Sequence, residues 1–243
     1  MPGLSIESQP PIHDCFAPGE ISALRPSEYT ALLIQSLRAR PELVVGRDVL
    51  EIGTGSAAVL AALGDMQARS LSGVDVEMVA VEFGRRLLER LGHGARTQLH
   101  CGDMWKPLEQ QRFDLIVANL PQFPMETAGY SGRLPSWSSG GRDGRRLLDR
   151  FLAGLSTHLA DGGRAFITHN GFIDLQRTRD LVAQSGLSLR VVMTMLVPLP
   201  SEKIDMMTRD TLLAQLGRSI YCYGPYAFAD LHIVEVGMDE NFV

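Results

Sequence analysis

The chain has 243 residues, of which 45% are hydrophobic and 21% are charged, and its formal net charge is −5. This composition is ordinary for one globular domain and argues against collagen-like, disordered and membrane classes. The acidic balance disfavours a nucleic-acid partner, because binding to a phosphate backbone normally needs a basic surface. We therefore treat residues 1–243 as a single domain.

The cysteines, the first residues and the hydrophobic pattern of the chain indicate in which cellular compartment to expect the protein. Cys15, Cys101 and Cys222 form no CxxC pair, so the sequence indicates neither a zinc site nor a disulfide framework. The first residues lack the basic and apolar regions of a secretory signal, and no later run is apolar over a membrane length. We expect a cytoplasmic protein with no metal and no membrane partner, and the sequence leaves assembly as a homodimer open.

Residues 1–47 predict an irregular cover followed by one helix. The first twenty or so residues are rich in proline and polar side chains, a composition typical of loops. Ser27 is a suitable N-cap for a helix. Apolar side chains then recur at helical spacing, at Tyr29, Leu32, Leu33 and Leu37.

Residues 48–63 predict a buried strand, a glycine turn and the start of a helix. Val49, Leu50 and Ile52 form the short apolar run of a central parallel strand. Gly53 and Gly55 permit a tight turn and close approach of the backbone to a ligand. By itself this pattern fits an S-adenosylmethionine (SAM) site, a nicotinamide site or a structural turn.

A second predicted strand ends at Asp75, twenty positions after Gly55. In doubly wound sheets, an acidic residue at this position can accept hydrogen bonds from the ribose hydroxyls of a bound nucleoside. A carboxylate here would also stabilise the start of the next helix without any ligand. Glu77 is the neighbouring candidate, and we rank it second because it falls in the first turn of that helix.

A third predicted strand, residues 97–101, is followed by Gly102, Asp103 and Met104. At the end of the strand, the Asp103 carboxylate can bond an adenine amino group while Met104 packs against the flat base. Trp105 can add to that packing. The alternative is a turn aspartate beside a partly buried tryptophan.

The fourth predicted strand, residues 113–118, leads directly into Asn119, Leu120, Pro121 and Gln122. A planar nitrogen has a delocalised lone pair, so methylation needs oxygen atoms that accept its N–H bonds and turn the lone pair toward the methyl donor. Asn119 can supply such an oxygen, Pro121 fixes the backbone, and Gln122 can hydrogen-bond an acceptor. The alternative is a turn that ends the strand.

The remaining chain continues the alternation of helices and strands. Residues 131–139 carry Trp137 and are interpreted as a lid before an amphipathic helix, and a fifth strand at residues 165–169 ends in His169. We expect His169 to bond backbone rather than to act as a general base. A helix at 173–184, a strand at 189–196 and a last strand at 231–236 follow.

Residues 198–229 depart from a minimal fold of this kind. They concentrate methionine and aromatic side chains, namely Met206, Met207, Tyr221, Tyr223, Tyr226 and Phe228. Such side chains suit the wall of an apolar pocket, so we expect an insertion that shapes the substrate pocket. Packing of an added helix or a dimer contact would explain them equally well.

The motifs together resemble those of the class I SAM-dependent methyltransferases, and among them the HemK/PrmC-like glutamine N5-methyltransferase group. The resemblance implies an α/β fold with a doubly wound, Rossmann-like, seven-stranded sheet that is mostly parallel and ends in an antiparallel hairpin. It implies SAM as cofactor and S-adenosylhomocysteine as product. The residues that it assigns to the cofactor are Glu51, Gly53, Thr54, Gly55, Asp75, Asp103, Met104 and Asn119, and those that it assigns to catalysis are Asn119, Pro121 and Gln122.

Three departures bear on the acceptor. Ala57 replaces a motif glycine, Leu120 and Gln122 replace the Pro and Tyr of the family's Asn-Pro-Pro-Tyr, and only about fifty residues precede the glycine motif, where the family usually carries a helical domain that recognises the release factor. We expect a nitrogen acceptor in a small molecule, peptide or protein, and not a release factor. A SAM-binding module or partner subunit without turnover is the second hypothesis, and a nucleic-acid adenine N-methyltransferase is the third.

Overall fold

The structure is a computed structural model that describes residues 25–125 and 137–238. Its strands are β1 (Asp48–Ile52), β2 (Ser70–Asp75), β3 (Thr97–Cys101), β4 (Phe113–Ala118), β5 (Leu159–Asn170), β6 (Ser188–Pro198), β7 (Ile220–Tyr223) and β8 (Tyr226–Gly237). Its α-helices are α2 (Glu28–Arg38), α3 (Ala58–Asp65), α4 (Met78–Arg90), α6 (Arg146–His158), α7 (Leu175–Gln184), α8 (Ser201–Met206) and α9 (Arg209–Gln215). Short 3₁₀ turns are η1 (Pro41–Leu43), η2 (Gly94–Arg96) and η3 (Lys106–Leu108).

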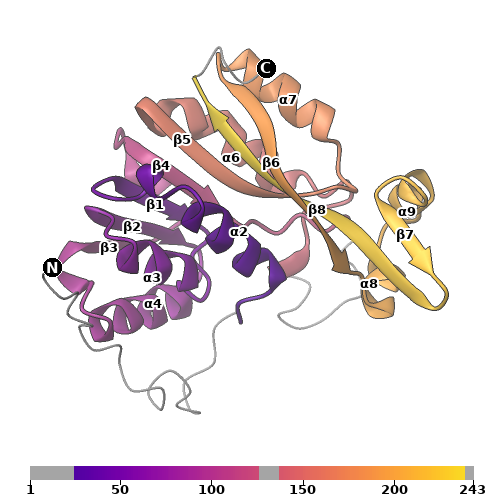
Figure 1. The fold of residues 1–243 in the computed structure, drawn as a ribbon, viewed down its shortest axis with the longest axis horizontal. Coiled ribbons are helices and arrows are strands. Elements are labelled where there is room, and N and C mark those ends of the chain that lie inside the picture. The colour runs from indigo at the N-terminus through magenta and orange to yellow at the C-terminus, as the bar shows by residue number, and fades with distance from the viewer. Residues whose placement is uncertain (1–24, 126–136, 239–243) are drawn as a thin grey trace, which may run out of the picture.

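The strands form one sheet in the order β3-β2-β1-β4-β5-β8-β6 (Figure 1). Strands β1 to β5 pair in parallel, whereas β8 runs antiparallel between β5 and β6. This confirms the predicted mostly parallel, doubly wound sheet with its antiparallel end. The short β7 pairs with β8 off this path, so the sheet has eight strands in the described part of the chain rather than seven.

Helices cover both faces of the sheet, and two apolar cores lie between the layers. Helices α2 and α3 lie on one face with α4, and α6 and α7 lie on the other (Figure 1). Strand β1 contributes to both cores. Val49 belongs to the core shared with α2 and α3, whereas Leu50 and Ile52 belong to the core shared with α6. Burial on both faces is the physical reason for its continuous apolar run.

The predicted first helix is confirmed as α2, and its apolar stripe includes the fully buried Leu33 and Leu37. Strand β5 differs from the prediction, because it begins at Leu159 and not at Ala165. Residues 159–164 form the added part of this strand, and they include Gly162 with a φ of +73°. They coincide with a shift in its register against β4.

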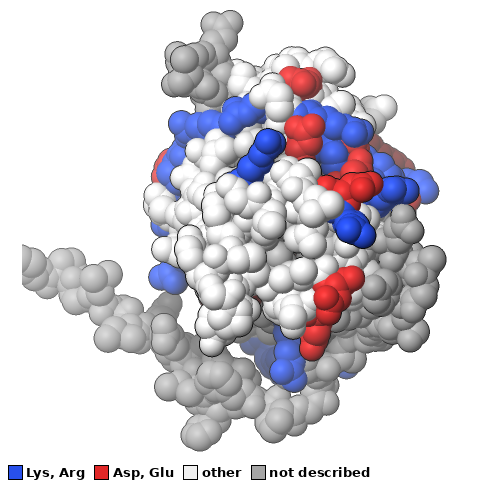
Figure 2. Space-filling model, turned by 90° about the vertical axis from the view of Figure 1, so that its right-hand side faces the viewer, with Lys and Arg blue, Asp and Glu red and all other residues white. Residues whose placement is uncertain are grey.

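Residues 198–229, which we call the arm, contain α8, α9 and β7. The arm connects β6 to β8 and lies at the end of the sheet where β6 ends and β8 begins (Figure 1). Exposed apolar side chains on the arm are Leu213, Leu216, Tyr223 and Tyr226. Figure 2 views the molecule from this side, and the centre of the visible face is mostly uncharged, with positive and negative side chains intermixed toward its edges. This face therefore carries no concentrated basic patch among the described residues.

Candidate cofactor and acceptor site

A pocket of about 230 Å³ lies at the carboxyl ends of β1, β2 and β4. This is the place where ligands bind in open α/β sheets, because the strand order reverses there. Residues of the glycine turn, of the ends of β2 and β3 and of the segment after β4 line it, whereas no residue of the arm does. The lining residues are Ile52, Gly53, Gly55, Val74, Asp75, Val76, Glu77, Ala80, Gly102, Asp103, Met104, Asn119, Leu120, Pro121, Trp137 and Leu147.

The turn between β1 and α3 forms the floor of this pocket. Gly53 and Gly55 both have positive φ, of +78° and +47°, which glycine adopts without a steric penalty. Ala57, at the position where the family has a third glycine, also adopts a left-handed φ of +55° and caps α3. Ala57 thus takes the left-handed conformation that a glycine would adopt freely, at a conformational cost of about 1–2 kcal/mol.

Asp75 is held in place by the backbone on both sides of the pocket. Its Oδ2 accepts the Gly55 N–H at 2.8 Å and its Oδ1 accepts the Glu77 N–H at 2.9 Å. A carboxylate offers about four lone-pair sites, so each oxygen can still accept a hydroxyl. The glycine turn and the carboxylate are thus positioned as one unit.

Glu77 and Trp137 extend the pocket beyond the residues that we ranked first. The indole N–H of Trp137 donates to Oε1 of Glu77 at 3.0 Å, and both residues line the pocket. The lid interpretation covered residues 131–139, but residues 131–136 lie outside the described residues. Trp137 itself is a wall residue of the pocket, and its amino-acid type was the signal that could have identified it.

The predicted adenine end contains Asp103 and Met104, and both line the pocket. The carboxylate of Asp103 accepts two bonds from Nη2 of Arg150, at 2.8 and 2.7 Å, and lies 3.1 Å from Nζ of Lys106. These cations, Arg150 above all, hold the pKa of Asp103 below its ordinary value. Val76 lines the same pocket with 66% of its surface exposed, so it offers an apolar face to a flat base.

Trp105 does not pack toward this pocket, which corrects the expectation that it helps to hold adenine. Its ring stacks on His158 with a centroid distance of 4.6 Å and lies 5.1 Å from Phe151. Its indole N–H donates to the carbonyl of Phe151 at 3.2 Å. Trp105 is thus partly buried against α6, in agreement with the alternative of a partly buried tryptophan.

Asn119 and Pro121 line the pocket directly after β4. Oδ1 of Asn119 accepts the hydroxyl of Thr168 at 2.8 Å. Asn119 therefore enters the pocket as a fixed side chain at the end of a buried strand.

Gln122 lies elsewhere, which corrects the expectation that it contacts an acceptor. Its side chain is 3% exposed and its amide is used by β5, because Nε2 donates to the Thr168 carbonyl at 2.6 Å and Oε1 accepts the Asn170 N–H at 3.2 Å. Strand β4 pairs with β5 only as far as Ala118 and Ile167. The Gln122 carboxamide therefore replaces the peptide group that a longer β4 would supply.

Glu51 and Thr54 are buried beneath the turn and do not line the pocket, which corrects their assignment as cofactor contacts. The methyl group of Thr54 packs over Gly73 of β2. Burial raises the pKa of the Glu51 carboxyl well above its ordinary value, and the nearby Asp75 raises it further. Oε2 of Glu51 has no hydrogen-bond partner among the described residues.

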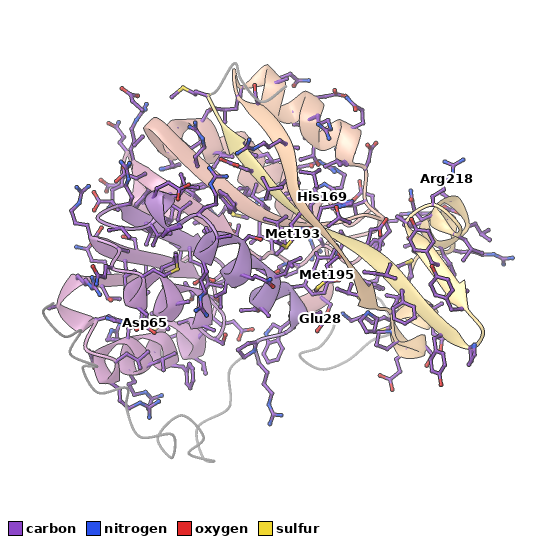
Figure 3. The ribbon with its side chains drawn as sticks, in the orientation of Figure 1. Glu28, Asp65, His169, Met193, Met195 and Arg218 are labelled. Atoms are coloured by element: carbon purple, nitrogen blue, oxygen red, sulfur yellow. The ribbon has the colours of Figure 1, made fainter. Side chains whose placement is uncertain are left out.

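His169, labelled in Figure 3, lies on β5 and is not among the residues that line the pocket, as we expected of a structural histidine. It is fully buried, with Nδ1 3.0 Å from the Asn170 carbonyl and Nε2 2.9 Å from the Thr178 hydroxyl. Burial and the neighbouring Arg145 lower its pKa to about 3. The side chain is therefore neutral at physiological pH.

Residues 25–125 and 137–238 contain neither a cluster of metal ligands nor a helix of membrane-spanning length and apolarity. No group of three His, Cys, Asp or Glu side chains gathers there to hold a metal ion. No helix in these ranges is long and apolar enough to cross a membrane.

The lining of the pocket offers the polar and apolar groups that a nucleoside would need. Asp75 offers acceptors for ribose hydroxyls, Val76 and Met104 offer apolar contact for a base, and the two glycines allow close approach of the backbone. Asn119 lines the same pocket.

The chain is similar in sequence to known methyltransferases. Residues 15–129 match the family model of the methyltransferase small domain. A Methanocaldococcus jannaschii protein assigned as a protein N5-glutamine methyltransferase is 27% identical over 71% of this chain and 85% of its own length. The release factor glutamine methyltransferase of Prochlorococcus marinus is 29% identical over 70% of this chain and 67% of its length. That of Geobacter sulfurreducens is 37% identical, but this chain covers 35% of it.

Solved structures show the same fold. A ribosomal protein L11 methylase of Lactobacillus delbrueckii superposes with a TM-score of 0.51 at 16% identity, covering 86% of this chain and 80% of that one. The 16S rRNA N2 G1207 methyltransferase of Thermus thermophilus, solved with AdoMet and guanosine, gives 0.56 at 21% identity, covering 90% and 45%. The motifs, the sheet order and these comparisons show that the chain resembles the class I methyltransferases and, in sequence, the proteins named as glutamine N5-methyltransferases.

Proposed function

We propose that this chain binds SAM in the pocket and transfers its methyl group to the side-chain amide nitrogen of a glutamine in a protein, which leaves S-adenosylhomocysteine and releases one amide proton to solvent. Bound SAM supplies an electrophilic methyl group on a sulfonium centre. Asp75 would hold the ribose, the turn from Gly53 to Gly55 would approach the amino-acid end, and Asp103, Met104 and Val76 would hold the base. Each of these residues lines the pocket.

The observation that carries the proposal is the place of Asn119. It follows β4 at the rim of the pocket, and its Oδ1 is already oriented by one hydrogen bond. The remaining lone pair of Oδ1 can accept an N–H of the acceptor amide, which turns the nitrogen lone pair toward the methyl group. Pro121 has no backbone N–H, so it cannot compete with the N–H groups of the methyl acceptor for the oxygen atoms that accept them.

The class of acceptor is inferred from the relatives. Two of those described above are named for glutamine methylation in release factors, another relative, from Bradyrhizobium diazoefficiens, is named ribosomal protein uL3 glutamine methyltransferase, and that relative is 34% identical over 47% of this chain. The net charge of −5 and the mixed charges of the arm face also favour a protein over a nucleic acid. We place this activity in the cytoplasm.

The contacts that the arm makes with the segment after β4 support a role for the arm in binding the acceptor protein. The Thr208 N–H donates to the Pro124 carbonyl at 2.8 Å, and its hydroxyl donates to the Arg142 carbonyl at 3.1 Å. Nζ of Lys203 lies 5.7 Å from the centroid of the Phe123 ring. The arm is thus rooted beside the segment that follows Asn119, where a protein acceptor would approach.

The test is incubation of the enzyme with isotopically labelled SAM and purified release factors, ribosomal protein uL3 and a total protein extract from the same cells. Mass spectrometry should find the label on a glutamine side chain. Asn119→Ala should bind SAM with unchanged affinity and transfer no label. Binding of SAM without transfer to any protein would favour a non-catalytic binding module, and label on nucleic acid would overturn the choice of acceptor.

A further inference from the structure

Thr168 stands out because it contacts Asn119 without lining the pocket. It lies on β5 with 1% of its surface exposed, and its hydroxyl donates to Oδ1 of Asn119 at 2.8 Å. No motif in the sequence indicates a role for it. Its importance depends on the pairing of two strands that are about fifty residues apart in the chain.

The strand register explains why the two side chains meet. Ala118 of β4 pairs with Ile167 of β5, so the next residues along the parallel strands, Asn119 and Thr168, lie beside each other. Beyond this point the backbone of β4 turns away. Gln122 then returns to bond the carbonyl of Thr168 and the N–H of Asn170, which holds the loop that carries Asn119 against β5.

A second element braces the same strand end. The hydroxyl of Tyr29 on α2 donates to Oδ1 of Asn170 at 2.8 Å. Thr168 and Gln122 are buried, and Asn170 is 5% exposed. The end of β5 is therefore held from the loop side and from the α2 side, so Thr168 offers its hydroxyl to Asn119 from a rigid position.

The orientation of the Asn119 carboxamide decides what it can do. One end of a carboxamide accepts hydrogen bonds and the other end donates two. A nitrogen that is to be methylated must donate its N–H bonds, so it needs the oxygen, and a rotated carboxamide would present N–H groups to N–H groups. In the arrangement observed, the Thr168 hydroxyl donates to Oδ1, which holds the oxygen end of the carboxamide toward β5 and leaves its second lone pair for the acceptor.

We propose that Thr168 is a positioning residue whose hydroxyl fixes the Asn119 carboxamide for the acceptor nitrogen, and this rests on the proposed function of Asn119. Thr168 touches neither cofactor nor acceptor in this arrangement. Its effect passes through Asn119, so its loss lowers the rate of methyl transfer and spares the binding of SAM.

The test compares Thr168→Val, which removes the hydroxyl and keeps the branched shape, with Thr168→Ser, which keeps the hydroxyl. Thr194→Val is the matched control, because Thr194 lies exposed on β6 and bonds His232. The side-chain NH₂ signals of Asn119 are assigned in an NMR spectrum as those that vanish in Asn119→Ala. Calorimetry gives SAM affinity, and labelled SAM gives kcat and KM for the protein acceptor.

Thr168→Val should shift or broaden the Asn119 NH₂ signals and lower kcat at least about tenfold, with SAM affinity and acceptor KM changed less than about threefold. Thr168→Ser should restore both, and Thr194→Val should match the wild type. The proposal is overturned if the NH₂ signals stay in place in Thr168→Val, or if Thr168→Ser loses as much activity as Thr168→Val. Shifted signals in an enzyme that labels no protein would instead count against the proposed function.

Discussion

The indole N–H of Trp137 donates to the carboxylate of Glu77 at 3.0 Å. Both residues line the pocket, although they are 60 positions apart in the chain. Glu77 is the residue immediately before α4, whereas Trp137 precedes α6. This bond joins two walls of one cavity. A ligand in the cavity would therefore alter the surroundings of the indole ring.

Trp137 should report the binding of SAM by its fluorescence. The chain has two tryptophans, and Trp105 is packed against Phe151 and His158 outside the pocket. We expect Trp105→Phe to keep the change in emission on titration with SAM and Trp137→Phe to lose it. Trp137→Phe should also weaken SAM binding by about 1 kcal/mol, because the bond to Glu77 is lost. A full fluorescence response in Trp137→Phe would contradict this placement.

Asp75 should contribute most of the polar affinity for SAM. Asp75→Ala removes the acceptors for the ribose and also frees the N–H groups of Gly55 and Glu77, so we expect affinity to fall more than tenfold, about 1.4 kcal/mol or more. Asp75→Asn keeps one acceptor oxygen and should lose less. Calorimetric titration of folded variants measures both, and Asp161→Asn, at a fully exposed side chain, is the control. Unchanged affinity in Asp75→Ala would remove Asp75 from the site.

Gln122 should be required for stability more than for acceptor contact. Gln122→Ala leaves the Thr168 carbonyl and the Asn170 N–H without their buried partner, which should lower the free energy of unfolding by about 1–3 kcal/mol. Gln176→Ala is the matched control, because Gln176 bonds Asp180 on the exposed face of α7. Urea denaturation measures both variants. Equal stability of the two would show that the amide does not bridge the strand end.

The local parts of the site could be predicted from the sequence. Gly53, Gly55, Asp75 and Asn119 each follow a short apolar strand, and parallel strands bring their carboxyl ends to one edge. That argument needs only the order of strands and turns, and the pocket gathers all four residues.

The parts that depend on pairing between distant strands could not be predicted. Gln122 follows Asn119 closely in sequence, yet its direction is decided by the end of β5 that β4 does not pair with, and Thr168 gains its contact from the same register. Trp105 follows the adenine motif but turns toward α6 because the small Gly154 leaves room for its ring. A sequence pattern gives the type of each residue, but it does not show which distant strand or helix the side chain will contact.

The buried His169 should make the protein less stable as the pH falls. Its pKa is about 3 in the folded chain and 6.5 by default, lowered by burial, by Arg145 and by His232. Between these values the unfolded chain binds the extra proton, so the contribution of His169 is complete above about pH 6.5 and decreases toward pH 3. The limit is about 1.4 kcal/mol per pH unit. Glu51 acts in the opposite direction, because its folded pKa is raised and its contribution is lost as the pH rises above 4.5.

The variant His169→Gln isolates the histidine from the other titrating groups. Glutamine can donate to the Asn170 carbonyl and accept from Thr178, so it keeps the hydrogen-bond pattern of the neutral ring without titrating. We expect the stability difference between wild type and variant to be largest near pH 7.5 and to move steadily in favour of the variant as the pH falls to 4.5. Urea denaturation at several pH values measures this difference. Parallel pH curves for the two proteins would contradict this prediction, because they would mean that His169 has the same pKa in the folded and the unfolded chain.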